Sequence, residues 1–567
     1  MALPFRISAF LLVTFCAVPV FAQSGQGGIS SSNTGSTNTT GININDFVGA
    51  DRFYSEGFTG TRAVVAVVEG GHADLNHETS ANVTTQVLGT GVSGTNHDHA
   101  TAVTHATAGS VGGSISGTNY SRYGISYDSE VWTGDIATGF NANGSYQLTW
   151  ASIASTYSDI LDTGVGGRTA DVFNSSWWFG DPSGVRRDTM GVDGLLNHTG
   201  KVGVIIAGNG GSGDNTVLGM GSGYNSITVG ATGPDEGATP YGQLTSFSGV
   251  SPNEFSMATG TNSWNTISAA VAQRAAVDIV APGQSLTLAF ASQGNTSYGS
   301  NWSGTSFAAP IVAGGTGLMV DAGKAIYTNP SAIDGRVIKA ALMNSAQQLS
   351  GWDNAQTNIG GVITTTQALD FGQGTGQMDL NAAFDQYVDA ANGGLATTTD
   401  VAGTDQGDLG NVGVVGWDFG QVDEFDSNFY FFDQQLEADS DLRVTLTWFA
   451  DRDFGSNADF AGFGEEHLAN LDLAIFQFDN LTDRNILGTV AESISLFNVV
   501  EHLDFEVEAV GYYGVRVDYT SAHWNFTGET NETYGIAWRG VGVPEPTTLT
   551  FLVGFALATI ARRRRVG

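Results

Sequence analysis

Short apolar runs recur along the first two thirds of the chain and restrict the folds open to it. Residues 64–68 (VVAVV) and 202–207 (VGVIIA) have the length and composition of strands buried on both faces of a sheet. Helical segments such as residues 333–345 lie between such runs. Because alternating buried strands and helices pack as a parallel sheet covered on both sides, we expect an α/β domain with helices on both faces of the sheet.

A serine near a helix start is the first candidate for chemistry. Residues 304–310 (GTSFAAP) place Ser306 directly after a Gly-Thr turn and before a run of small residues that is typical of a buried helix. The hydroxyl would lie near the positive end of the helix dipole. A hydroxyl becomes an effective nucleophile only when a base takes its proton. Taken alone, the motif is more typical of an ordinary helix cap, so the other polar residues decide its meaning.

Three further residues supply the partners that such a serine needs. Glu69 ends the first apolar run, His99 opens a helix of small residues, and Asn209 follows the second apolar run. An acid, a histidine and a serine in this chain order occur in one of the three known arrangements of the catalytic triad. An Asn-Gly pair is commonly only a turn, but the amide of Asn209 is also the donor that an oxyanion hole requires. The pattern predicts a triad of Glu69, His99 and Ser306, with Asn209 as oxyanion donor.

These motifs resemble those of the subtilases, the subtilisin-like serine endopeptidases. The resemblance lies in the family blocks HGTxVAG, AAGN and GTSMAxP, which correspond to residues 99–105, 207–209 and 304–310, with weaker likeness at residues 171–176, 224–231 and 278–283. It implies that residues 45–390 adopt a subtilisin-like fold. It also implies that the protein is an enzyme that hydrolyses peptide bonds through an acyl-enzyme. It also implies that a polypeptide substrate binds as an added strand along Ser175, Ser176 and Trp177, and beside Gly208.

The acid departs from the family pattern, which has an aspartate followed by Ser/Thr-Gly. Glu69 keeps the charge and the acceptor oxygens but adds one methylene, and we expect the following Gly70 and Gly71 to make room for it. Asp74, past the end of the strand, is the alternative acid. A catalytically inactive surface-binding protein on the same fold is the alternative function, because this departure affects the triad itself.

Several histidines lie near the predicted base. His72, His77 and His97 together with His99 offer imidazole ligands for a metal, but no HExxH motif or cysteine pair supports a metal site. We expect the first three to lie in solvated loops. His105 replaces a family glycine in the helix that His99 opens, a departure that the sequence does not explain.

Residues 395–540 form a second domain with a different periodicity. Segments such as residues 442–448 (LRVTLTW) and 515–519 (VRVDY) alternate apolar and polar residues and are separated by turns without helices. This pattern predicts an antiparallel β-sandwich, which resembles the jelly-roll domains appended to many subtilases. We expect it to stabilise the first domain. The alternative is polymer or cell-surface binding through exposed aromatic residues such as Trp524.

Both ends of the chain carry the features of targeting segments. Residues 1–22 combine a basic start, an apolar run and a small-residue cleavage site, as in an export signal peptide, and residues 23–44 have the composition of a flexible linker. Residues 543–567 contain Pro-Glu-Pro, an apolar run and four arginines. They are similar to PEP-CTERM tails of Gram-negative bacteria, which an exosortase removes. The resemblance implies secretion to the cell surface or matrix, with transient membrane contact; the alternative is a plain C-terminal anchor.

Composition limits the partners and cofactors. The formal net charge is −35, with only 21 Lys and Arg residues, which excludes nucleic acid as a partner. Acidic side chains offer oxygen ligands for structural Ca²⁺, but no calcium site can be assigned, and the predicted chemistry requires no cofactor. The single cysteine, Cys16, lies in the predicted signal peptide, which excludes a cysteine protease.

Overall fold

The computed structural model describes most of both predicted domains. It covers residues 29–31, 41–110, 123–142, 145–234, 240–260, 267–388, 401–402, 411–455 and 464–541. The expected signal peptide and sorting tail, and most of the expected linker, lie outside the described residues. Within the described ranges, no helix has the length and apolar character needed to cross a membrane.

The first domain is built on an eight-stranded sheet with the order β10-β9-β8-β7-β2-β4-β3, to which β13 adds by pairing with β9. All of these pairings are parallel except that of β10 with β9. The strands are β2 (Val64–Glu69), β3 (Val83–Leu88), β4 (Glu130–Asp135), β7 (Val172–Ser175), β8 (Val202–Ile206), β9 (Ile227–Gly233), β10 (Gln243–Leu244) and β13 (Ile279–Pro282). The two apolar runs noted in the sequence are β2 and β8, both fully buried, so the expected buried parallel strands are confirmed.

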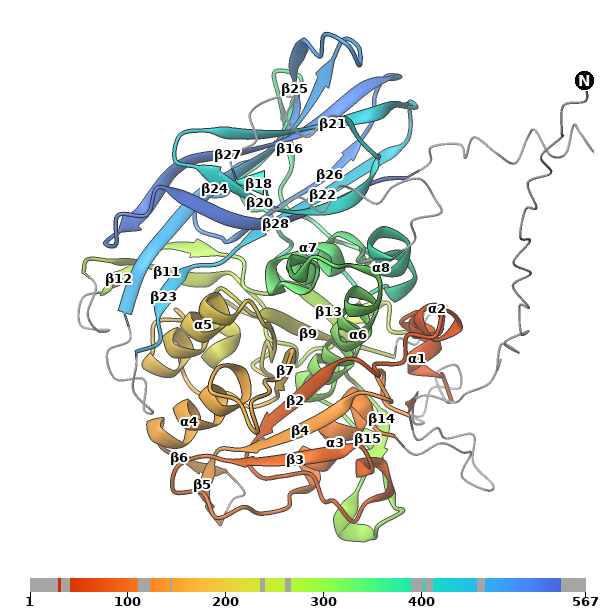
Figure 1. Cartoon of the computed structure of the whole chain (residues 1–567), viewed down its shortest axis with the longest axis vertical. Helices are drawn as coiled ribbons and strands as arrows, with labels where there is room; N and C mark the ends of the chain where they lie inside the picture. Colours follow the sequence, from red (N-terminus) through yellow and green to blue (C-terminus); the bar gives the residue numbers. More distant parts are fainter. Residues whose placement is uncertain are drawn as a thin grey trace, which may run out of the picture.

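Helices cover both faces of this sheet, as expected (Figure 1). Alternate residues of β2 point to opposite sides: Val65 and Val67 pack with helices α3 and α6, whereas Val64 and Val68 pack with α4 and α5. The helices of the domain are α1 (Ile44–Phe47), α2 (Ala50–Ser55), α3 (Asp98–Ala108), α4 (Trp150–Leu161), α5 (Arg187–Thr199), α6 (Thr305–Ile326), α7 (Gly335–Asn344) and α8 (Leu380–Tyr387).

Short sheets complete the first domain around this core. A three-stranded sheet has the order β1-β14-β15, and two hairpins pair β5 with β6 and β11 with β12. Their bounds are β1 (Ser30–Ser31), β5 (Ala137–Phe140), β6 (Tyr146–Leu148), β11 (Asn253–Ala258), β12 (Ile267–Arg274), β14 (Leu286–Ala289) and β15 (Tyr298–Trp302).

The second domain is a sandwich of two sheets, drawn mainly in cyan and blue in Figure 1. One sheet has the order β16-β17-β25-β24-β27-β21-β19, with β23 beside β24, and the other has the order β18-β20-β28-β22-β26. The strands are β16 (Thr357–Ile359), β17 (Val362–Thr365), β18 (Val401–Ala402), β19 (Asn411–Val412), β20 (Val415–Asp423), β21 (Ser427–Leu436), β22 (Asp441–Trp448), β23 (Asp451–Asp453), β24 (Gly464–Phe478), β25 (Ile486–Ser493), β26 (Val500–Glu506), β27 (Gly511–Asn525) and β28 (Asn531–Val541).

The sandwich core joins residues from both sheets. Val444 and Ile536 of one sheet pack in one cluster with Ile475 and Val515 of the other. The long strands pair antiparallel, which confirms the expected architecture. Trp524 belongs to the same core and is only 5% exposed, so the expectation of an exposed aromatic at this position is wrong.

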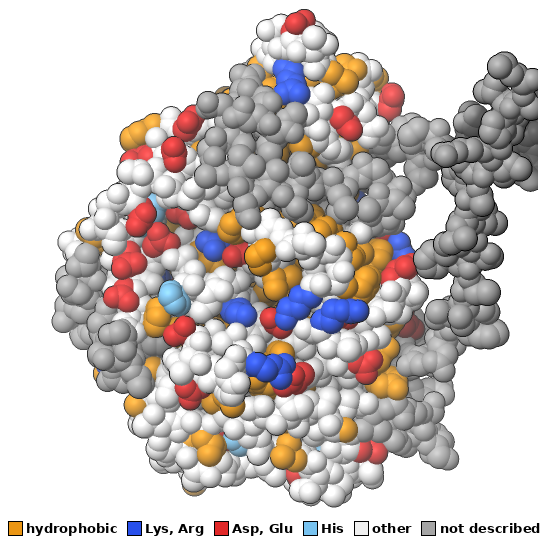
Figure 2. All heavy atoms as spheres, in the orientation of Figure 1, with side chains coloured by type: hydrophobic (Ala, Val, Ile, Leu, Met, Phe, Trp, Pro, Cys, Tyr) orange, Lys and Arg blue, Asp and Glu red, His pale blue; other side chains and the backbone are white. Residues whose placement is uncertain are grey.

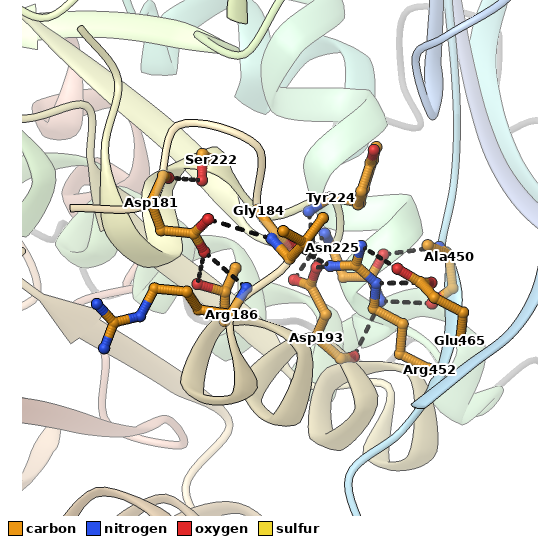
Figure 3. Close-up of polar contacts among 12 residues, drawn as sticks. Asp181, Gly184, Arg186, Asp193, Ser222, Tyr224, Asn225, Ala450, Arg452 and Glu465 are labelled. Carbon is orange, nitrogen blue, oxygen red and sulfur yellow. Dashed lines mark hydrogen bonds and ion pairs between the residues drawn. The ribbon is translucent and has the colours of Figure 1, made fainter. Parts of the chain in front are cut away.

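A buried arginine connects the two domains. Arg452 of β23 is inaccessible to solvent and donates to Asp193 of α5 and to Glu465 of β24, at 2.8 and 2.7 Å (Figure 3). Nearby, the Asn225 side chain donates to the Ala450 carbonyl and accepts from the Ala450 N–H. Helix α7 packs against β22 and β28. The sandwich is therefore attached to the first domain through a buried polar contact as well as through packing.

The few basic side chains mostly form ion pairs with carboxylates. On the face shown in Figure 2, basic groups lie beside acidic ones. Lys324 contacts Asp171 at 2.7 Å, and Arg62 contacts Asp321 at 2.9 Å. These cations thus offset the high negative charge of the protein locally.

Candidate active site

The residues predicted for catalysis lie at the carboxyl edge of the central sheet. Strands β2, β7 and β8 are parallel neighbours, so their C-terminal ends meet at this edge. Glu69 is the last residue of β2, Ser175 is the last residue of β7, and Asn209 lies three positions past the end of β8. His99 and Ser306 are the second residues of α3 and α6.

The buried carboxylate of Glu69 contacts the ring of His99. Its Oε2 atom lies 3.1 Å from His99 Nδ1, and its Oε1 atom accepts the Ser176 N–H at 2.8 Å. The Glu69 side chain is inaccessible to solvent, whereas the His99 side chain is 22% exposed. Two hydrogen bonds thus fix the carboxylate, and the ring reaches from it toward the surface.

Asp74, the alternative acid, has a different role. Its carboxylate accepts from the backbone N–H and the side chain of Asn76, at 2.9 and 3.0 Å, and so closes its own turn. Of the two candidate acids, Glu69 is the one that the structure places against His99.

The glycines after Glu69 accommodate other side chains. A Cβ on Gly70 would lie 2.6 Å from the ring of Tyr146, and a Cβ on Gly71 would lie 2.7 Å from the Cβ of His97. Both glycines are therefore required by close packing against Tyr146 and His97. Burial and the nearby charges of Glu69 and Asp135 raise the pKa of Tyr146, which keeps this ring neutral beside the acid.

The Ser306 hydroxyl hydrogen-bonds to a backbone carbonyl. The Oγ atom donates to the carbonyl of Ser176 at 3.3 Å, while Ser176 Oγ donates to the carbonyl of Ser306 at 3.0 Å. The ring of the next residue, Phe307, lies 5.6 Å from the ring of His99. No hydrogen bond between Ser306 and His99 is found among the described residues. Proton transfer between them would require the hydroxyl to turn away from Ser176.

Asn209 is oriented by the turn before the serine. Its Oδ1 accepts from the backbone N–H and the hydroxyl of Thr305, at 2.9 and 3.0 Å. The amide nitrogen therefore faces away from Thr305, and a Cβ on Gly304 would lie 3.5 Å from it. Gly208, also predicted to lie beside the substrate, adopts a positive φ of 92°, which turns the chain after β8.

The four residues predicted to line the substrate, Ser175, Ser176, Trp177 and Gly208, are all buried. The Ser175 hydroxyl contacts the buried Tyr157 hydroxyl at 2.5 Å, and Trp177 is 3% exposed in the core under α4 and α5. The next residue, Trp178, is 52% exposed.

Beyond these predictions, a cavity of about 360 Å³ lies nearby and is lined by Leu148, Thr149, Trp150, Ile153, Phe179, Arg186 and Asp188. No sequence pattern indicates this cavity, because its lining comes from three separate segments.

The histidines around the site are structural. His72 and His77 are 3% and 1% exposed; His72 bonds with Thr133, whereas His77 contacts the Ser297 carbonyl. The expectation of solvated loops is therefore wrong for these two. His97 is half-buried and stacks on Phe140.

His105 is buried between α3 and the β14 strand. Its Nδ1 accepts the Ala289 N–H at 3.0 Å, and burial lowers the pKa of its imidazole to about 3. The ring is therefore neutral, and it fills the space beside a strand that enters the core 184 residues later in the chain.

Two protein-family models match the chain. The model of the subtilase family matches residues 60–376, more than half of the chain, and the chain therefore belongs to the subtilase family. The protein is accordingly a serine-type peptidase, and its family implies polypeptide substrates. A second model, the PEP-CTERM protein-sorting motif, matches residues 542–565; this motif implies export in Gram-negative bacteria and processing by an exosortase.

Solved structures and curated proteins add little to the family match. Among the solved structures, the chain is similar to a protease from Pseudoalteromonas arctica PAMC 21717, at 19% identity and a TM-score of 0.41. That match covers 60% of this chain and 94% of the other. No curated protein matches the chain.

Proposed function

We propose that this protein is an exported endopeptidase that cleaves peptide bonds through an acyl-enzyme on Ser306, with Glu69 and His99 as its base system. The observation that carries the proposal is the 3.1 Å contact between the buried Glu69 carboxylate and His99 Nδ1, at the sheet edge where Ser306 begins α6. After its tail is processed, the enzyme acts at the cell surface or in the surrounding matrix.

The first half of the reaction forms the acyl-enzyme. With the Nδ1–H of His99 held by Glu69, the Nε2 atom is the basic nitrogen and takes the proton of Ser306 as its oxygen attacks the peptide carbonyl. Negative charge then develops on the carbonyl oxygen. The Asn209 amide and the Ser306 backbone N–H, at the start of α6, stabilise that charge.

Release of the amine completes the first half of the reaction, and attack by water is the second half, which returns the enzyme to its initial state. His99 gives its proton to the leaving amine, the peptide bond breaks, and the amine product departs. A water molecule then repeats the sequence on the ester of Ser306, and the carboxylate product is released. Glu69 stabilises the imidazolium that forms in each half-reaction.

In this mechanism, substrate binding must reorient the Ser306 hydroxyl. The Ser306 hydroxyl donates to the Ser176 carbonyl in the free protein, and the substrate must turn it toward His99. Hydrogen bonds of catalytic groups commonly tighten only in the complex. We place an extended substrate beside the exposed Trp178, with one of its side chains in the cavity next to Trp150 and Phe179.

The second candidate function is an inactive binding protein on the same fold. It is favoured by one observation, the engagement of the Ser306 hydroxyl by Ser176 instead of by His99. In that case Glu69, His99 and Ser306 would not catalyse peptide-bond hydrolysis.

A serine-directed fluorophosphonate probe distinguishes the two candidates, because it forms a covalent bond only with an activated hydroxyl. We expect labelling of the folded protein, mapped by mass spectrometry to Ser306 and abolished by Ser306→Ala. Ser303→Ala is a matched control, since this serine lies three positions earlier, outside helix α6, and its loss should leave labelling intact. Absence of labelling in folded protein would favour the binding protein.

A further inference from the structure

Three potential metal ligands meet in the second domain. They are Asp451 of β23, His467 of β24 and Glu532 of β28, and one ligand atom from each lies within 4.8 Å of the other two. The strands belong to both sheets of the sandwich, since β23 and β24 pair in one sheet and β28 lies in the other. The cluster therefore lies where the two sheets face each other.

Two of these groups are buried without a hydrogen-bond partner for the atom that faces the cluster. His467 is 0% exposed and Glu532 is 4% exposed. Neither His467 Nδ1 nor Glu532 Oε2 has a hydrogen bond to any described residue. Buried polar atoms in folded proteins almost always have a partner, so two such atoms facing each other call for a ligand.

The remaining polar atom of each side chain is held by the protein. The Tyr519 hydroxyl contacts His467 Nε2 at 2.6 Å, and Asn197 Nδ2 donates to Asp451 Oδ1 at 2.7 Å. Glu532 Oε1 accepts the N–H of Thr533 at 3.1 Å. Outer contacts of this kind orient the ligands of metal sites and leave one atom of each free to coordinate.

The spacing fits coordination better than direct ion pairing. His467 Nδ1 lies 3.4 Å from Asp451 Oδ2 and 3.5 Å from Glu532 Oε2. Charge-assisted hydrogen bonds from an imidazolium are shorter, about 2.7–2.9 Å. Ligands bound to Zn²⁺ at 2.0–2.2 Å in a tetrahedron are separated by about 3.3–3.6 Å, which matches both distances.

Electrostatics also favours a cation here. The nearby Arg336 guanidinium already forms two hydrogen bonds to Asp334. Two carboxylates beside a buried imidazole are costly unless a positive charge joins them.

We propose that Asp451 Oδ2, His467 Nδ1 and Glu532 Oε2 bind a divalent transition-metal ion of the Zn²⁺ type. One nitrogen and two oxygen ligands suit such an ion, whereas Ca²⁺ takes six to eight oxygens. The fourth position is filled by water, and the partly exposed Asp451 gives the ion its entry. Because Asn197 lies on α5, the bound ion connects both sheets of the sandwich to the first domain.

Calorimetric titration of chelator-treated protein with Zn²⁺ tests this site. The protein carries Ser306→Ala, which prevents self-digestion. We expect one Zn²⁺ per chain, a melting temperature raised by the ion, and visible absorption bands when Co²⁺ is used instead. His467→Gln should weaken Zn²⁺ binding by at least about 100-fold, beyond the effect of losing an outer partner.

His502→Gln is the matched control, because His502 is an equally buried histidine of the same domain, bonded to Thr445 and outside the cluster. The His502→Gln variant should bind Zn²⁺ with the same affinity as the protein without this substitution. If His467→Gln does not fold, Asp451→Asn replaces it, since this side chain is 22% exposed and its amide can keep the Asn197 contact. Folded protein that fails to bind Zn²⁺, that binds it equally with these ligands replaced, or that responds only to Ca²⁺ would overturn the proposal.

Discussion

Replacing Glu69 by glutamine changes one atom of the proposed base system and little of its shape. The amide oxygen can still accept the Ser176 N–H, which Glu69 Oε1 accepts at 2.8 Å. The amide nitrogen then faces His99 Nδ1, where Oε2 now lies at 3.1 Å. An N–H donor at this position forces the proton of the ring onto Nε2, the atom that must accept the proton of Ser306.

This tautomer error sets the size of the expected effect. A triad with its acid replaced by the amide loses about 10⁴-fold in kcat, which corresponds to about 5.4 kcal/mol of transition-state stabilisation. The assay is steady-state hydrolysis of a peptide substrate near neutral pH. KM should change little, because Glu69 is fully buried and does not contact the substrate.

Asp74→Asn is the matched control for this prediction. Its carboxylate closes a turn with Asn76 and does not contact His99, so kcat should stay within a few-fold of the parent value. The reasoning is refuted if Glu69→Gln keeps more than a tenth of the activity, or if Asp74→Asn is the variant that loses it.

Three further effects follow from the structure. Asn209→Ala should lower kcat by about 10²–10³-fold with KM nearly unchanged, as for loss of one oxyanion donor, and a change in KM alone would contradict that role. Arg452→Met should lower the free energy of unfolding in urea by about 3–5 kcal/mol, because it leaves Asp193 and Glu465 buried without their cation; a loss below about 1 kcal/mol would contradict this. His105 has a folded-state pKa of about 3, below its ordinary 6.5, so only the unfolded state takes up its proton as the pH falls below about 6.5. His105→Gln should remove about 2 kcal/mol of the stability loss between pH 7 and pH 5, and equal pH slopes in both proteins would show that the ring does not titrate as described.

The fold could be predicted well where the apolar pattern itself determines it. The run at β2 is apolar at every position before Glu69 because both faces of the strand are covered, and the alternating run at β22 predicted a sandwich strand. The hairpin of β16 and β17 was not anticipated. It lies within the segment predicted for the first domain, yet it pairs with β25 of the sandwich, and such long-range pairing leaves no local pattern.

The positions of the candidate residues could be predicted, since Glu69 ends a strand, Asn209 follows one, and His99 and Ser306 begin helices. Contacts between distant segments could not be predicted. The buried state of His77 depends on the Ser297 carbonyl, 220 positions away, and the direction of the Ser306 hydroxyl depends on Ser176. The cluster of Asp451, His467 and Glu532 could not be predicted for the same reason, because its members come from three strands with no characteristic spacing.

Whether Ser306 and His99 act as one unit is measured most directly by the kcat values of Ser306→Ala, His99→Ala and the double variant. When a serine and a histidine act as one unit, removing either abolishes the contribution of both to catalysis. In subtilisin, removal of either one lowers kcat by about 10⁶-fold. We expect each single variant to lose activity on this scale and the double variant to lose no more. Additive losses, or substantial turnover in either single variant, would contradict catalysis by this pair.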